Sequence, residues 1–446
     1  MSKWTTLNVC ILLGLLNVAG SLDERGAMAD TQDAAASDFE DSLHGVMLQI
    51  DGLPRTLRPS GASLSVPRAP APSYLGSPRA GVSEELNSRI GRSLEGDRWR
   101  VRWRTDLNPR LTPAVTLQAA DRILLAGPYE WELFDLTGQS VAVGRRGAGE
   151  IVLEPTGSRF WVPSESGMIE VYDLGKGARL FATSAFGGGA FRRGGLFFRE
   201  GRSLVISIEY LARPHSASPP SMSAVEAYEF KQPQQIDQYG FLNSTSLRGR
   251  WVHPSITLLA AVHAGTLVVA LENRLYFSDW ELNTPTVLQS EFTPEWMSLD
   301  EGGRVYLVAR SPAGHALWMV TPNGERILNA PIPDTMPALI APPIVGYNHR
   351  VYLVSGDHIR AINPDGTLAW EHLSAKRIAG AVVTADDRLL VSAGSEVASF
   401  DEHGERTALY DTNEELSTPP ILTAADDILV ASAQHLFCMT SKPSQS

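Results

Sequence analysis

The chain has 446 residues, of which 43% are hydrophobic and 20% charged, and its formal net charge at pH 7 is −12. These proportions are typical of a soluble globular protein with enough apolar residues for a core. The acidic balance argues against binding to nucleic acid or to an anionic membrane surface, because both need a basic patch that displaces counterions.

The first 29 residues have the layout of a secretory signal peptide. Lys3 is followed by an apolar run from Leu7 to Ala19 and then by small residues at Ala27 and Ala29. The run is shorter than the roughly 20 residues that span a bilayer. We expect export to the periplasm or the cell exterior, with an uncleaved membrane anchor as the alternative. Cleavage would leave Cys438 as the only cysteine, so we expect no internal disulfide.

Residues 30–98 are rich in Ala, Ser, Pro and Arg and poor in periodic apolar positions. Such a segment cannot bury enough apolar surface to offset the entropy of ordering, so it is predicted to be a disordered linker. One piece differs: Ser83 can cap a short helix over residues 83–94. That helix would place Leu86, Ile90 and Leu94 on one side.

From Trp99 onward, short apolar strands alternate with turns rich in Gly, Asn and Asp. The pattern is clearest over residues 341–373, which are predicted to form four strands, the last of them following the turn Pro364–Gly366. Four antiparallel strands make one blade of a β-propeller, and weaker copies recur from about residue 111. Residues 99–446 divide into eight units of about 43 residues, or into seven of about 50 as the alternative. We therefore predict an all-β, eight-bladed propeller.

The eighth predicted unit ends near Cys438 without a fourth strand. The segment Trp99–Thr105 (WRVRWRT) resembles Thr367–His372 (TLAWEH), the fourth strand of the sixth unit. We predict that this N-terminal segment supplies the missing outer strand and closes the ring without an open edge. The alternative is that its tryptophans only cap a loop. Within the third unit, Ala212–Ser223 is predicted to be an inserted loop.

The sequence AINPDGTLAW at Ala361–Trp370 and the segment Thr418–Pro420 resemble the repeats of the PQQ-like, or quinoprotein-type, β-propeller superfamily. The resemblance covers about residues 99–446 and is clearest in units six to eight. It implies two functional branches. One contains quinoprotein dehydrogenases, which bind pyrroloquinoline quinone and calcium on the propeller axis. The other contains non-enzymatic propellers, such as the periplasmic scaffold of the outer-membrane β-barrel assembly machinery, and the fold does not choose between them.

Several features depart from the dehydrogenase branch. That branch implies a disulfide between adjacent cysteines over the cofactor, whereas only Cys438 would remain here. Its repeats usually read A-x-D-x-x-T-G-K-x-x-W, whereas Ala361–Trp370 is one residue shorter and lacks Thr-Gly-Lys. The pairs Asp386–Asp387 and Asp426–Asp427 follow a first strand, where Asp is favoured in turns rather than as a calcium ligand. We expect no catalytic residue, cofactor or metal.

The strand order predicts which face would bind a partner. Loops between the second and third strands share one face, the loop face, with the connections that lead into each first strand. The opposite face, the turn face, carries short regular turns. Because binding residues concentrate in varied loops on a rigid scaffold, the loop face is the candidate. Its predicted binding residues are Tyr129, Glu130, Trp131, His215, Glu272, Asn273, Arg310, His315, Asp357, His358, Glu396, Gln434 and His435.

This mixture of aromatic, acidic and histidine side chains suits a protein or peptide partner, or a glycan, better than a polyanion. We therefore expect an exported, non-catalytic propeller that acts as a binding or assembly scaffold in the cell envelope. The alternatives are a quinone-dependent dehydrogenase and a carbohydrate-active propeller enzyme, which would need two carboxylates about 5 to 10 Å apart.

Overall fold

The computed structural model describes residues between 99 and 441, with gaps of which the longest are 185–195, 211–221 and 231–244. All described residues belong to the second of two compact units, residues 54–446. The predicted signal peptide, linker and short helix therefore lie outside the described residues. In the part of the chain that is described, no helix is long and apolar enough to cross a membrane.

The described residues form thirty-two strands in eight four-stranded antiparallel sheets, which confirms the predicted all-β architecture. Sheets one and two comprise β2 (Val115–Ala119), β3 (Arg122–Ala126), β4 (Glu130–Asp135), β5 (Ser140–Arg145), β6 (Val152–Leu153), β7 (Arg159–Pro163), β8 (Met168–Asp173) and β9 (Arg179–Ser184). Sheets three and four comprise β10 (Leu196–Arg199), β11 (Ser203–Tyr210), β12 (Met222–Phe230), β13 (Thr245–His253), β14 (Leu258–His263), β15 (Thr266–Leu271), β16 (Arg274–Ser278) and β17 (Thr286–Gln289).

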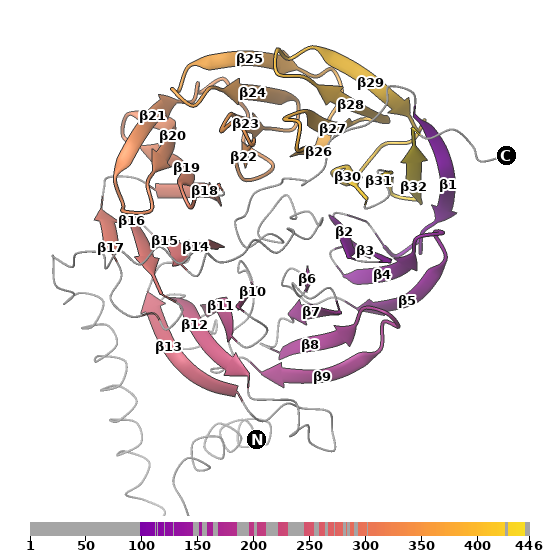
Figure 1. Ribbon diagram of the computed structural model, residues 1–446, viewed down its shortest axis with the longest axis horizontal. Helices are drawn as coiled ribbons and strands as arrows, with labels where there is room; N and C mark the ends of the chain where they lie inside the picture. Colours follow the sequence, from indigo (N-terminus) through magenta and orange to yellow (C-terminus); the bar gives the residue numbers. More distant parts are fainter. Residues whose placement is uncertain are drawn as a thin grey trace, which may run out of the picture. The chain divides into compact units, whose positions relative to one another are not determined.

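The remaining sheets continue in chain order, and Figure 1 shows all eight following one another around a common centre. Sheets five and six comprise β18 (Thr293–Leu299), β19 (Val305–Ser311), β20 (Gly314–Val320), β21 (Arg326–Pro331), β22 (Ile344–Val345), β23 (Val351–Val354), β24 (His358–Ile362) and β25 (Leu368–Leu373). Sheets seven and eight comprise β26 (Ile378–Val383), β27 (Leu389–Ala393), β28 (Glu396–Phe400), β29 (Arg406–Asp411), β30 (Ile421–Leu422), β31 (Ile428–Ala431), β32 (His435–Thr440) and β1 (Arg100–Asp106).

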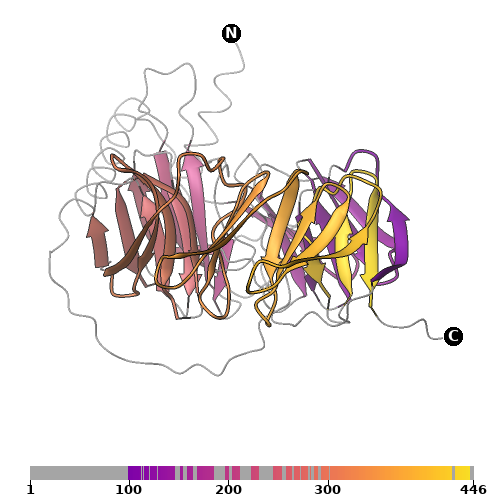
Figure 2. The ribbon, with the colours of Figure 1, turned by 90° about the horizontal axis from the view of Figure 1, so that it is seen from above.

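Burial falls from the inner to the outer strand of a sheet. In sheet six every residue of β23 is buried, whereas β25 contains only exposed and half-buried residues. Strands buried on both faces read as continuous apolar runs, as the sequence VYLV of β23 does. The outer strands β5, β21 and β25 consist mainly of exposed and half-buried residues, and their exposed residues include Val143, Ile327 and Leu368. Figure 2 shows the strands running between two opposite faces, with the loops at either end.

Apolar clusters join consecutive sheets face to face. Because apolar area removed from water stabilises by roughly 25 cal/mol per Å², these contacts supply much of the stability. One cluster also contains residues of both the first and the eighth sheet. Representative members are Leu275 with Leu307, Tyr306 with Leu353, Tyr352 with Phe400, Leu133 with Phe160, and Leu125 with Phe437.

Outer strands also lie against turn glycines of the following sheet. A Cβ added at Gly404 would lie 2.7 Å from Trp370 of β25, and one added at Gly138 would lie 2.7 Å from Trp103 of β1. Both glycines have positive φ angles, +80° and +85° respectively, which glycine adopts without steric cost. The two tryptophans, which belong to strands that resemble each other in sequence, therefore make the same contact.

Substitution of Gly404 by valine is expected to lower the free energy of unfolding by about 1–3 kcal/mol, because the backbone becomes strained and the side chain meets Trp370. Gly314→Val is the matched control. Gly314 also has a positive φ, +108°, but nothing lies within 4 Å of an added Cβ. Urea denaturation of both variants should give the larger loss for Gly404→Val, and equal losses would contradict the packing contact.

β1 pairs antiparallel with β32, so the eighth sheet takes its outer strand from the start of the described residues. Arg102 Nη1 lies 2.6 Å from Oδ2 of Asp427, whose side chain is only 4% exposed. Trp103 Nε1 donates to the carbonyl of Leu136, and Thr105 Oγ1 donates to the carbonyl of Gly138. These bonds attach the outer strand of the eighth sheet to both its own sheet and the first.

The structure changes the prediction for the third unit in two ways. β12 begins at Met222, so Met222 and Ser223 belong to a strand, and the rest of the predicted insertion lies outside the described residues. The fourth strand of this sheet, β13 (Thr245–His253), was not identified from the sequence. Its sequence TSLRGRWVH mixes polar and basic residues with Leu247, Trp251 and Val252, so it lacks the continuous apolar run that is typical of an inner strand.

Candidate functional site

Three of the loops between second and third strands, in sheets one, six and eight, share one turn geometry on the loop face. The N–H of the first turn residue donates to the carbonyl of the fourth in Gly127 to Glu130, Ser355 to His358 and Ser432 to His435, with N···O distances of 2.8–2.9 Å. The fourth residue begins the third strand, and in these sheets it is charged or a histidine. Its neighbours decide what it can do chemically.

His358 of sheet six is buried and paired. Its Nε2 lies 2.7 Å from Oε1 of Glu371, on the outer strand of the same sheet. Arg360 Nη1 lies 3.0 Å from the same oxygen. Asp357 is exposed beside it, and its carbonyl accepts the N–H of Ser374. His358 therefore ties the loop to the outer strand.

Glu396 occupies the corresponding place in sheet seven. Its Oε1 lies 2.6 Å from Nη2 of Arg406, and its Oε2 lies 3.7 Å from Nζ of Lys376. The Glu396 side chain is 17% exposed, whereas those of Arg406 and Lys376 are 37% and 47% exposed. One carboxylate thus faces two cations at this edge of the loop face.

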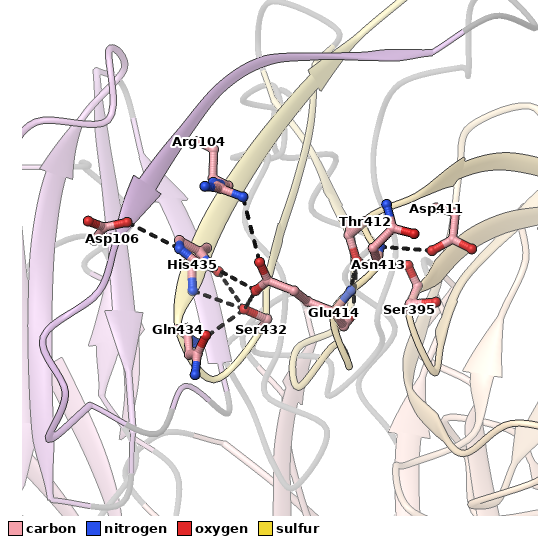
Figure 3. A network of polar contacts seen from close by, with 10 residues as sticks. All are labelled: Arg104, Asp106, Ser395, Asp411, Thr412, Asn413, Glu414, Ser432, Gln434 and His435. Atoms are coloured by element: carbon pink, nitrogen blue, oxygen red, sulfur yellow. Dashed lines mark hydrogen bonds and ion pairs between the residues drawn. The ribbon is translucent and has the colours of Figure 1, made fainter.

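His435 of sheet eight lies between two carboxylates, as Figure 3 shows. Its Nδ1 is 2.7 Å from Oε2 of Glu414, and its Nε2 is 3.1 Å from Oδ1 of Asp106 at the end of β1. Ser432 Oγ donates to the same Glu414 oxygen, at 2.7 Å. Arg104 Nη1 lies 3.7 Å from Glu414 Oε1. The network joins β1, β32 and the connection from sheet seven.

Glu414 is the most densely bonded acid of this network. Burial alone would raise its pKa, but hydrogen bonds from Ser432 and His435 and the charges of His435 and Arg104 together hold its pKa below the ordinary value of 4.5. A depressed pKa means that the folded state favours the ionised carboxylate. The resulting stability is present above the unfolded pKa and is lost as the pH falls through the folded pKa.

We expect Glu414→Gln to flatten the acid limb of the stability profile. The melting temperature of the unmodified chain should fall more steeply below pH 4.5 than that of the variant, because only the former must protonate Glu414. Thermal denaturation followed by circular dichroism from pH 7 to pH 3 measures the difference. Parallel profiles would mean that Glu414 makes no differential contribution.

Sheet five carries a more exposed group. Arg310 Nη2 lies 2.8 Å from Oε1 of Glu295, and Arg310 Nε lies 2.8 Å from Nε2 of His315. The same Glu295 oxygen lies 3.6 Å from His315 Nε2. The Arg310 side chain is 62% exposed, so this group is presented to solvent rather than built into the sheet.

The other predicted binding residues divide by exposure. Tyr129 is 76% exposed, Glu130 and Asn273 are half-buried, and Gln434 is exposed with its carbonyl accepting the N–H of Leu107. Trp131 differs from the prediction, because it is 1% exposed.

The ring of Trp131 packs edge-on against Phe160 and Tyr172, since β4 is buried on both faces. Its side chain therefore belongs to the core and not to a binding surface. His215 and Glu272 lie outside the described residues.

The structure brings the described candidates into separate pairs, one group per sheet, and not into one common site. The partners Glu371, Arg406 and Glu414 were not identified from the sequence. Glu371 and Arg406 lie on outer strands, where the sequence pattern predicts that a charged side chain points into solvent. Glu371 lies opposite Arg360 and Arg406 lies opposite Phe400, so each side chain reaches along its strand to meet the residue that begins the third strand.

The described residues do not form a metal or cysteine centre. No group of three or more His, Cys, Asp or Glu side chains that could hold a metal ion occurs within the described ranges. Cys438 is buried in β32, and burial, followed by the charge of Asp427, raises the pKa of its thiol. A thiol with a raised pKa is a poor nucleophile and a poor metal ligand.

Comparison with known proteins identifies the fold. No family model and no curated protein matches the chain. BamB from Moraxella catarrhalis is similar with a TM-score of 0.53 and 12% identity, over 77% of this chain and 99% of that chain. Quinohemoprotein alcohol dehydrogenase from Comamonas testosteroni is similar with a TM-score of 0.59 and 11% identity, over 84% and 81% of the two chains.

A second dehydrogenase, quinohemoprotein alcohol dehydrogenase ADHIIG from Pseudomonas putida HK5, has a TM-score of 0.57 and 10% identity, again over 84% and 81%. At such identities these likenesses establish the fold alone. That fold is the β-propeller that the repeats predicted.

Proposed function

We propose that the chain is an exported, eight-bladed propeller closed by β1, and that it acts as a non-catalytic scaffold that binds a protein or peptide through its loop face. The observation that carries this function is the distribution of polar side chains on that face. His358, Glu396 and His435 each pair within their own part of the ring. Catalysis needs groups that converge on one reacting centre, whereas a scaffold needs rigid loops over a wide surface.

The extent of the structural likeness also supports a scaffold. The match spans 99% of the BamB chain but 81% of each dehydrogenase chain, so part of each dehydrogenase has no counterpart here.

Site-specific photo-cross-linking in the cells that produce the protein tests this proposal. A benzophenone amino acid replaces Tyr129, which is 76% exposed on the loop face, or His403, whose side chain is 75% exposed in a turn of the opposite face. We expect protein adducts of defined mass from position 129 and none from position 403. Equal labelling from both positions, or none from position 129, would refute binding through the loop face.

The second candidate is a quinone-dependent dehydrogenase, which the higher TM-scores of 0.59 and 0.57 favour. The described residues do not fit that cofactor. They offer neither a pair of adjacent cysteines nor a cluster of carboxylates for calcium, since Cys438 is the free cysteine among them and no metal-binding group occurs there. Thermal denaturation with added pyrroloquinoline quinone and calcium separates the candidates. A ligand at a hundred times its Kd stabilises by about 2.7 kcal/mol, and we expect no such shift.

A further inference from the structure

A pocket of about 290 Å³ lies between sheets six and seven. Figure 1 shows β25 next to β26–β29 at this seam. The pocket reaches the loop face, because Ala393 and Glu396 flank the loop between β27 and β28. Its wall is apolar on the sheet-seven side and is formed there by Ile378, Val391, Ala393, Ala398 and Phe400.

The opposite wall comes from the end of β25 and the connection that follows it. His372 packs edge-on against Phe400, with ring centroids 4.8 Å apart. Burial lowers the pKa of His372, and the charges of Arg406 and His358 lower it further, so its ring is neutral at neutral pH and adds to the apolar wall. Leu373 is 72% exposed at the mouth. A leucine this exposed extends the apolar surface beyond the pocket.

The polar rim carries more positive than negative charge. Lys376 and Arg406 line the pocket and both face the single carboxylate of Glu396, so the charged lining groups sum to one positive charge. Asp411 lies outside the pocket lining. Its carboxylate accepts the N–H of Asn413, and this bond, together with the charge of Lys376, lowers the pKa of Asp411. Lys376 lies 3.7 Å from Glu396 and is 47% exposed, so it has room for a second carboxylate.

The size of the pocket decides the kind of ligand. Pockets for whole small molecules occupy roughly 300–1,000 Å³, so this one is at the lower limit. It suits a single large apolar side chain, the type of anchor that carries much of the energy in protein interfaces. A carboxylate beside that side chain would reach Lys376 and Arg406 at the rim.

We propose that this pocket binds a peptide segment of a partner protein in which a large apolar residue stands next to Asp or Glu. The apolar side chain enters the pocket and packs against Phe400 and His372, and the acidic neighbour pairs with Lys376 and Arg406. This inference rests on the proposed binding function and names the chemistry that its partner must have.

Selection of a display library of random linear peptides on the full chain tests the proposal. We expect enriched peptides to combine a Leu, Ile, Phe, Trp or Met residue with an adjacent Asp or Glu. The Kd of an enriched peptide should rise about five- to tenfold in Lys376→Glu, because charge reversal replaces attraction by repulsion. Arg377→Glu is the matched control, since Arg377 is exposed next in the chain but does not line the pocket, and should change the Kd less than about twofold.

Leu373→Ser should also weaken binding, and it should do so without affecting folding because the side chain is already in solvent. Failure to enrich peptides, enrichment without an acidic residue, or equal effects of Lys376→Glu and Arg377→Glu would each overturn the proposal. The cross-linking from position 129 does not depend on this pocket. A partner captured there, together with a negative peptide selection, would retain the scaffold function and reject this pocket as its peptide site.

Discussion

Removal of residues 1–106 is expected to give an unstable or aggregating protein, whereas removal of residues 1–97 should give a soluble monomer. The difference between the two variants is β1 and Trp99. Trp99 is buried at 7% exposure, and losing a large buried aromatic side chain costs about 3–5 kcal/mol. The longer deletion also strips the pairing from β32, and an unpaired strand edge recruits other chains.

Electrostatics add to the effect of the longer deletion. The nearly buried carboxylate of Asp427 would lose Arg102, its partner at 2.6 Å, and an uncompensated buried charge is strongly destabilising. His435 would lose Asp106. Size-exclusion chromatography and thermal denaturation of the two variants measure the outcome. If both variants are equally soluble and melt at the same temperature, β1 does not close the ring.

The sequence predicted β1 because a tryptophan-bearing strand has a recognisable pattern. Trp103 and Trp370 each lie two residues after an apolar residue, Val101 and Leu368 respectively. The eighth unit also ends without a fourth strand in the sequence, which indicated where such a strand was needed. β13 has no comparable pattern, and it was not predicted because polar residues interrupt its apolar ones. Predictions of inner strands were reliable because burial on both faces leaves a run such as VYLV, which few other local structures produce.

The candidate site was predictable only in position. Loop residues such as His358 and His435 could be placed on one face, because two-residue periodicity and turn signals fix where a strand begins. Their chemistry depends on Glu371 and Glu414, which lie 13 and 21 residues away in the chain. Trp131 shows the same limit, since a residue beside a loop can still point into a strand buried on both sides.

Replacement of Asp300 by alanine is expected to lower the free energy of unfolding by about 3 kcal/mol, because it removes a buried carboxylate with several partners. Asp300 has no exposed surface and lies in the turn between β18 and β19. Its Oδ1 accepts the N–H groups of Gly302 and Arg304, and its Oδ2 lies 2.6 Å from Arg304 Nε and 3.1 Å from the hydroxyl of Tyr306. His349 of sheet six lies 3.5 Å away, so the carboxylate links two sheets.

Removing one partner of a buried ion pair costs about 3–5 kcal/mol, and we expect the lower end because the Arg304 side chain is 28% exposed. Burial alone would raise the pKa of Asp300, but the N–H and guanidinium of Arg304 and the N–H of Gly302 outweigh it and lower the pKa. The stabilisation is therefore present above the unfolded pKa and disappears as the pH falls through the folded value. An Asp300→Asn variant should lack this acid dependence.

Asp401→Ala separates the buried ion pair from the turn itself. Asp401 Oδ1 accepts the N–H groups of His403 and Glu405, the same two positions that Gly302 and Arg304 occupy relative to Asp300. Among the residues that the structure describes, the Asp401 carboxylate has no counterpart of the Arg304 guanidinium, the Tyr306 hydroxyl or the His349 ring. Urea denaturation at pH 7 should give a loss for Asp300→Ala that exceeds the loss for Asp401→Ala by about 2 kcal/mol or more. Equal losses would mean that the turn bonds, and not the link between sheets five and six, make Asp300 important.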